Sequence, residues 1–96
     1  MDASTVAAAL ELHKARLEEL GVERLLLVGS VARGEDTVKS DIDFVVEFRG
    51  KATFLGYMNL LELLEETMGR TVELTTLKAL RPEIAADVLS KARRVA

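Results

Sequence analysis

Apolar residues recur at helical spacing in the first twenty residues of the chain. The recurrence predicts an amphipathic helix over residues 4 to 20, ended by Gly21. Its apolar stripe consists of Val6, Leu10, His13, Leu17 and Leu20. His13 therefore lies on or beside the face that a core would cover. Because no second candidate ligand surrounds it, a partly buried or interface histidine is the favoured interpretation, with a catalytic base or ligand as the alternative.

Two strand patterns follow, separated by a short turn. Residues 24 to 28 are a continuous run, Arg-Leu-Leu-Leu-Val, which is typical of a strand covered on both faces. Gly29 ends this run, residues 30 to 33 predict one helical turn, and residues 35 to 40 predict a polar loop. Residues 41 to 48 then predict a second strand, which begins with two carboxylates.

The second half of the chain predicts a long helix and a third strand. Thr53 is a good N-cap for a helix that runs to Met68. Residues 71 to 75 alternate as a strand, with Glu73 on one face and the apolar side chains on the other. The helix carries an apolar stripe that we interpret as core, with the role of its tyrosine left open: Phe54, Tyr57, Met58, Leu61, Leu64 and Met68.

The last helix is predicted over residues 82 to 91, because Pro82 is favoured in a first helical turn. Its inward positions are Ile84, Val88 and Leu89. A short edge strand could follow at residues 93 to 95. Strands interleaved with helices indicate an α/β (α+β) fold, in which helices pack on a small sheet of three to four strands. We expect one domain over residues 1 to 96.

Composition narrows the class of protein. The 96 residues are 49% hydrophobic, which suits one compact core. The lack of cysteine and the single histidine exclude a disulfide framework, a thiolate zinc site and a histidine cluster. No signal peptide and no run of about 18 apolar residues is visible, so we expect a cytoplasmic protein with no membrane partner. The net charge of −3 argues against nucleic acid as a partner.

The two carboxylates of the second strand stand at spacing i, i+2. Asp41 and Asp43 therefore share a face, about 6.5–7 Å apart along the strand. Carboxylates this close repel each other unless a cation lies between them. One strand away, Gly29-Ser30 joins a strand to the start of a helix, where exposed backbone N–H groups suit a phosphate. The combination predicts a site for Mg²⁺-nucleotide chemistry.

A third carboxylate completes the candidate site if the second and third strands are neighbours. Glu73 would then join Asp41 and Asp43 as a catalytic and metal-binding residue. Two Mg²⁺ ions held by such a triad can stabilise the attacking and leaving oxygens of a displacement at phosphorus. Glu73 would either complete the second metal site or accept the proton of the attacking hydroxyl.

Four further residues are candidates for contacts with the nucleotide. Gly29 would let the backbone approach the phosphates, and the Ser30 hydroxyl and N–H group would bind them. Arg33, one helical turn on, could point at the polyphosphate, and so could Lys39 from the loop.

These residues resemble the signature of a known group of enzymes. Gly29-Ser30, ten residues, then Asp41-Ile42-Asp43 fit the G-S-x10-D-x-D pattern of the DNA polymerase beta-like nucleotidyltransferase superfamily. The local sequence resembles specifically the minimal nucleotidyltransferase (MNT) family, in the segments Gly-Ser-Val-Ala-Arg-Gly-Glu and Ser-Asp-Ile-Asp-Phe-Val-Val. The family usually places Asp where this chain has Glu73, whose extra methylene shifts the carboxylate by about 1.5 Å.

The resemblance implies a mixed β-sheet with helices on one side. It implies transfer of a nucleoside monophosphate, AMP from ATP with Mg²⁺, to a hydroxyl acceptor with release of pyrophosphate. Members of the MNT family are commonly encoded beside a helical HEPN protein. In such pairs the HEPN protein is an RNase toxin, and the MNT protein is the antitoxin that silences it, in characterised cases by adenylylating a tyrosine. A HEPN toxin is thus the expected partner and an adenylyltransferase the expected enzyme.

Two other functions stay open at this point. One is transfer to a small hydroxyl compound, although such enzymes usually carry a second domain. The other is a non-catalytic antitoxin or subunit that keeps the fold and binds its partner through its surface. The sequence leaves the acceptor, the nucleotide, the choice between Mg²⁺ and Mn²⁺, and the oligomeric state open, a homo-oligomer included.

Overall fold

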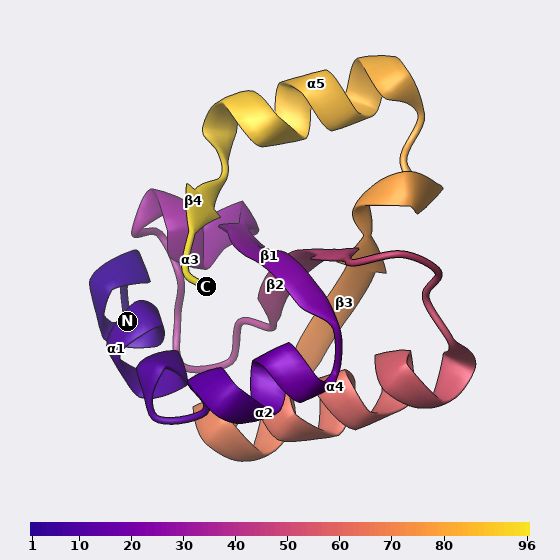
Figure 1. Ribbon diagram of the computed structural model, residues 1–96. Helices are drawn as coiled ribbons and strands as arrows, with labels where there is room; N and C mark the ends of the chain where they lie inside the picture. Colours follow the sequence, from indigo (N-terminus) through magenta and orange to yellow (C-terminus); the bar gives the residue numbers. More distant parts are fainter.

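A four-stranded mixed sheet organises the computed structural model, which describes residues 1–96 (Figure 1). The strands are β1 (Val22–Val28), β2 (Ile42–Phe48), β3 (Val72–Thr76) and β4 (Arg93–Arg94), in the order β3-β2-β1-β4. β1 runs antiparallel to both β2 and β4, whereas β2 and β3 are parallel. The three predicted strands, the short edge strand and the mixed sheet are therefore confirmed.

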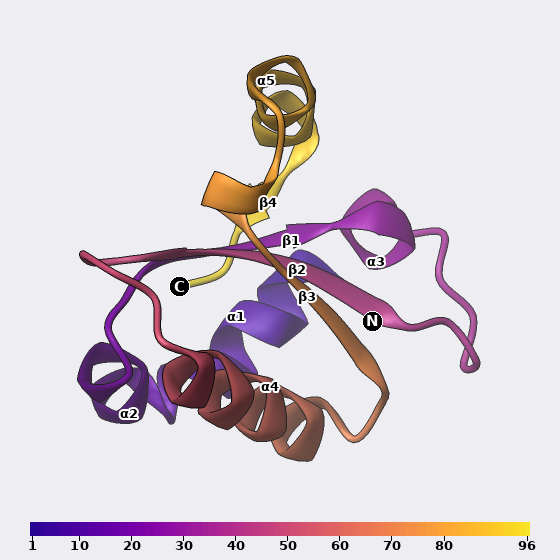
Figure 2. The same cartoon turned by 90° about the vertical axis from the view of Figure 1, so that its right-hand side faces the viewer.

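Helices lie on both sides of this sheet. They are α1 (Ala3–Glu11), α2 (Lys14–Glu19), α3 (Gly29–Arg33), α4 (Phe54–Met68), the 3-10 turn η1 (Leu77–Ala79) and α5 (Pro82–Lys91). Figure 2 shows the sheet nearly edge-on, with α1, α2 and α4 below it and α5 above. The expectation that all helices lie on one side is thus wrong for α5. None of these helices is long and apolar enough to cross a membrane.

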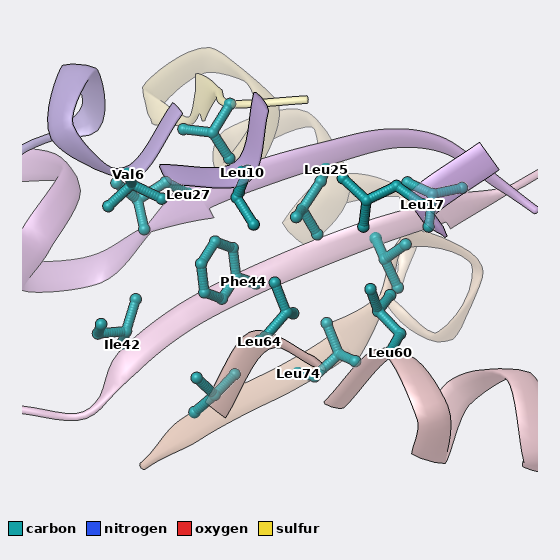
Figure 3. Close-up of a cluster of buried hydrophobic side chains, with 14 of the residues drawn as sticks. Val6, Leu10, Leu17, Leu25, Leu27, Ile42, Phe44, Leu60, Leu64 and Leu74 are labelled. Atoms are coloured by element: carbon teal, nitrogen blue, oxygen red, sulfur yellow. The ribbon is translucent and has the colours of Figure 1, made fainter. Parts of the chain in front are cut away.

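The hydrophobic core fills the space between the sheet and α1, α2 and α4 (Figure 3). Alternate strand residues point into it, as the period of two requires. Phe44 is the largest fully buried side chain and lies among leucines from both layers. The core members drawn with labels are Val6, Leu10, Leu17, Leu25, Leu27, Ile42, Phe44, Leu60, Leu64 and Leu74.

The helix predicted over residues 4 to 20 is broken into two. His13 has φ −114° and ψ 19°, outside the helical range, and separates α1 from α2. Leu10 and Leu17 are both buried on either side of the break, while Leu12 is exposed. His13 is partly buried, as the favoured interpretation expected, and occupies the N-cap position of α2.

The core face of α4 differs from the predicted stripe. Leu60 and Leu64 are its buried residues, and Leu60 was not in the stripe. Met58 precedes Leu60 by two positions, about 200° around a helix, and so lies on the outer face. Phe54 and Met58 are accordingly 81% and 40% exposed, so their assignment to the core is wrong. Tyr57 packs against the core and donates a hydrogen bond from its hydroxyl to the Leu74 carbonyl.

The bounds of α5 match the predicted 82–91, but its packing does not. No residue of α5 is buried, and Ile84 and Leu89 are 46% and 40% exposed. Only Val88 of the three predicted inward residues is partly buried. The reason is visible in Figure 2, where α5 lies on the side of the sheet opposite α1, α2 and α4, away from the core. Residues of α5 and of the strands line a groove that matters for the site described next.

Candidate active site

The sheet register brings two of the three predicted carboxylates side by side. Asp43 in β2 pairs with Val28 of β1 on one side and with Glu73 of β3 on the other. Glu73 was expected to join the two aspartates if the second and third strands were neighbours, and β2 and β3 are paired. All three side chains belong to the sheet face opposite the core, which α5 crosses. Asp41 lies just before β2 and is exposed.

Electrostatic repulsion is concentrated on Asp43. Partial burial raises the pKa of its carboxyl above the usual value of 3.8, and the neighbouring charge of Glu73 raises it further. A hydrogen bond with Glu73 and the charge of Asp41 act in the same direction, whereas Arg33 lowers this pKa. The three carboxylates thus form one electrostatic unit around Asp43, and a cation placed there would relieve the repulsion.

Gly29, at the junction of β1 and α3, lies in close contact with the Asp43 carboxylate. Its φ is +71°, a left-handed conformation that favours glycine. A Cβ atom added at this position would lie 2.3 Å from Oδ2 of Asp43. The missing side chain therefore lets the Asp43 carboxylate lie directly against the backbone of the Gly-Ser turn. Because α3 is a single turn, this close approach matters more than a helix dipole.

A groove runs beneath α5 and is lined by both Gly29 and Asp43. One part, of about 250 Å³, is lined by Asp43 and Glu73 together with Val28, Phe44, Val45, Thr75, Leu80 and Val88. The other part, of about 350 Å³, is lined by Val28, Gly29, Ala32, Arg33, Asp87, Val88 and Lys91. Val28 and Val88 line both parts, so the two are adjacent. Sites of this size accommodate small molecules.

The predicted nucleotide contacts are placed unequally. Gly29 and Arg33 line the groove, although Arg33 also donates a hydrogen bond from Nε to Oε1 of Glu35 at 2.7 Å. Ser30 is partly buried and follows Gly29 within α3. Lys39 is exposed in the loop before β2 and lines neither part of the groove. The structure therefore brings Gly29 and Arg33 to the carboxylates and does not bring Lys39 there.

The donor set at this end of the groove fits a hard divalent cation. Asp41, Asp43 and Glu73 offer only carboxylate oxygens, which Mg²⁺ prefers. No three acidic or histidine side chains are close enough in this conformation to hold one ion together. Such sites use one or two carboxylates and take their other ligands from water and from substrate phosphates, so two converging carboxylates are sufficient.

Several residues of the groove are absent from the sequence prediction. Thr75 could have been found, because it shares the strand face of Glu73. Leu80, Asp87 and Lys91 carry no local signal, since their position depends on where α5 crosses the sheet. The sequence places Asp87 and Lys91 on a helix, but nothing in their spacing relates that helix to the Gly-Ser turn.

An ion pair anchors the loop that leads to Asp41. Arg70 Nη1 lies 3.1 Å from Oδ2 of Asp36, and the Asp36 side chain is only 7% exposed. Replacing Arg70 by Met should lower the free energy of unfolding by about 2 kcal/mol, because it leaves the buried Asp36 carboxylate with only the N-terminal ammonium group, 3.9 Å away. Urea denaturation would measure this loss. The double variant Asp36→Asn/Arg70→Met should recover most of it, and a double variant as unstable as the single one would contradict the explanation.

The raised pKa of Asp43 predicts a pH-dependent effect of its replacement. The pKa of the Asp43 carboxyl is higher in the folded state than its unfolded value of 3.8. This carboxyl therefore stabilises the folded protein below about pH 3.8, and the stabilisation is lost as the pH rises through the raised pKa. Asp43→Asn should therefore raise the Tm at pH 7 by a few degrees, since 1 kcal/mol corresponds to about 4–8 °C in a domain of this size. Calorimetry at pH 7 and pH 3.5 tests this, because the gain should vanish at about pH 3.5. An equal gain at both pH values would show that repulsion is not the cause.

Comparison with known proteins identifies relatives along almost the whole chain. The family model described as "nucleotidyltransferase domain" matches residues 10–95. Protein adenylyltransferase MntA of Thermococcus cleftensis is 35% identical over 85 residues, which are 88% of this chain and 86% of that protein. A solved structure assigned as a minimal nucleotidyltransferase has a TM-score of 0.83 at 33% identity, covering 97% of this chain and 95% of the other.

A more distant structure shares the fold. It is the complex of a tri-AMPylated HEPN toxin of Shewanella oneidensis with its MNT antitoxin. The matched chain has a TM-score of 0.57 at 16% identity, over 90% of this chain and 71% of that chain. At this identity the likeness concerns the arrangement of helices and strands alone.

Proposed function

This chain belongs to the nucleotidyltransferase domain family and is a nucleotidyltransferase, and from this premise we propose that it transfers AMP from ATP to a tyrosine of a HEPN partner protein. The transfer would silence the partner, so the chain would act as an antitoxin. The observation that carries the proposal is the placement of Asp43 and Glu73 in register on neighbouring strands, directly beside Gly29.

The supporting comparisons address the nucleotide and the acceptor separately. The relative from Thermococcus cleftensis is named a protein adenylyltransferase, which supports AMP as the transferred group and a protein as the acceptor. The complex from Shewanella oneidensis contains an AMPylated HEPN toxin, which supports a HEPN protein as the partner. The open groove beneath α5 suits a protein acceptor, because a hydroxyl carried on another chain has to reach Asp43 from outside.

Asp41, Asp43 and Glu73 are the residues proposed to hold two Mg²⁺ ions. When bound, the ions would neutralise phosphate charge and stabilise the attacking and leaving oxygens. Gly29, which lines the groove, would let the backbone approach the phosphates, and Ser30 and Arg33 would bind their oxygens. In the reaction the acceptor oxygen bonds to the α-phosphorus, the bond to the bridging oxygen breaks, and pyrophosphate leaves. A carboxylate at Glu73 is placed either to complete the metal site or to take the acceptor proton.

Mass spectrometry of the partner tests this function directly. A candidate HEPN-family partner would be produced alone and together with this chain, and the intact mass of each sample compared. The expected result is the addition of one or more AMP groups, located on tyrosine and dependent on Asp43. A tight complex with an unmodified but silenced partner would instead favour the non-catalytic antitoxin, and transfer to added small hydroxyl compounds would favour the small-molecule enzyme.

A further inference from the structure

Charges are segregated along the groove beneath α5. The part that contains Asp43 and Glu73 has apolar walls and no cationic side chain. The adjacent part, on the far side of Val28 and Val88, is lined by two cations, Arg33 and Lys91, and by Asp87. Gly29 lines this second part and also lies against Asp43, so the boundary between the two parts passes through the Gly-Ser turn.

The distribution of apolar and charged groups along a nucleoside triphosphate matches the distribution along this groove. Its apolar base lies at one end and its charged β- and γ-phosphates at the other, with the reacting α-phosphate between them. With the α-phosphate at Gly29 and Asp43, the terminal phosphates can follow the groove into the part lined by Arg33 and Lys91. The opposite orientation would place the terminal phosphates among Leu80 and Val45, away from both cationic side chains.

Lys91 is suited to bind phosphate but is held by a neighbour in the free protein. Its Nζ lies 3.2 Å from Oδ1 and 3.4 Å from Oδ2 of Asp87, one helical turn earlier in α5. Both side chains are largely exposed, so this ion pair is weak and can be exchanged for a phosphate at small cost. A flexible lysine side chain can swing from Asp87 towards the groove without moving the helix.

We infer that Lys91 binds the β- and γ-phosphates of the donor nucleotide and stays with the leaving pyrophosphate, while Asp87 competes with them for its ammonium group. This inference rests on the proposed function, because it assumes a triphosphate donor with its α-phosphate at Asp43. It assigns α5, which contributes nothing to the core, a role in holding the leaving group. No covalent step is added: Lys91 contributes charge to the group that departs.

Binding of ATP and of AMP to the intact chain separates this role from a structural one. Calorimetric titration with Mg²⁺ present should show that Lys91→Met weakens ATP binding about tenfold, since a charge-assisted hydrogen bond to phosphate is lost. AMP binding should be unchanged, because AMP lacks the phosphates that Lys91 contacts. The matched control is Lys51→Met, which removes the same charge from an exposed turn outside the groove and should alter neither affinity.

The substitution Asp87→Asn should strengthen ATP binding, whereas Lys91→Met should weaken it. Without its competitor, Lys91 should bind ATP about threefold more tightly, again with no change for AMP. Equal ATP affinity in the wild type and Lys91→Met, or equal losses for ATP and AMP, would overturn the inference. So would weaker ATP binding by Asp87→Asn, which would indicate that Asp87 itself serves the nucleotide. Failure of the wild type to bind ATP at all would instead contradict the proposed function.

Discussion

Replacement of Asp43 by Asn is expected to reduce nucleotidyl transfer by about 10³-fold or more, because the remaining carboxylates cannot hold a metal ion against the α-phosphate. Asp43 is the centre of the unit: it pairs in register with Glu73 and is the group whose pKa both other carboxylates raise. The amide has nearly the same shape and keeps a partner for Glu73, so the geometry of the strand should survive.

The rate of AMP transfer at saturating ATP is the measurement. Glu66→Gln is the matched control, since it removes one carboxylate from an exposed position of α4 that lies outside the groove. It should transfer at the wild-type rate. The predicted rise in Tm distinguishes loss of chemistry from loss of fold, because Asp43→Asn should be inactive while more stable. An unstable and inactive variant would leave the loss attributable to misfolding and contradict the electrostatic account.

Replacement of Gly29 by Ala is expected to reduce transfer by about 10²-fold, because the new methyl group displaces Asp43 from its productive position. The added Cβ would meet Asp43 Oδ2 at 2.3 Å. This atom is the end of a side chain, so the protein can relax by rotating the carboxylate away. Stability should fall by only about 1–2 kcal/mol, which is the cost of a left-handed alanine.

Gly34 provides an internal control for this substitution. It ends α3 with φ +73°, close to the value of Gly29, and a Cβ added there meets nothing within 4 Å. Gly34→Ala should therefore lose the same stability in urea denaturation and keep nearly full transfer activity. If the two alanine variants were equally active, the contact between Gly29 and Asp43 would have no role in the reaction. If both were inactive, backbone strain in α3 would explain the loss.

Local sequence signals were sufficient for most elements of this fold. Pro82 and Thr53 begin helices at the predicted positions, and the Thr53 hydroxyl accepts the predicted cap bond from the N–H group of Gly56. Alternation in the third strand correctly separated Glu73 from the core residues. In each case the information lies within a few residues of the position concerned, as it does for turns, caps and strand faces.

The errors concern features that depend on packing between distant segments. No glycine or proline marks the break at His13, which separates two helices that each bury a leucine against the sheet. Periodicity alone gave α5 an inward face, but the helix crosses the opposite side of the sheet with Ile84 exposed. The position of α5 also forms the groove, so the groove residues on α5 could not be predicted from the sequence.

Within the site, the sequence was informative where the chemistry requires fixed spacing. Asp43, Glu73 and Gly29 are brought together as expected, because strand parity and one turn determine their positions. Lys39 is not, because the conformation of a polar loop has no periodicity from which to place a side chain. Arg33 reaches the groove, yet its salt bridge with Glu35 was beyond prediction for the same reason.

Transfer of radioactive label from ATP tests the central claim most directly. The chain would be incubated with Mg²⁺, its HEPN partner and ATP labelled on either the α- or the γ-phosphate. The predicted result is label on the partner from α-labelled ATP only, abolished by Asp43→Asn, with release of pyrophosphate. Label from γ-labelled ATP, or equal labelling by the wild type and Asp43→Asn, would contradict nucleotidyl transfer at the carboxylates beneath α5.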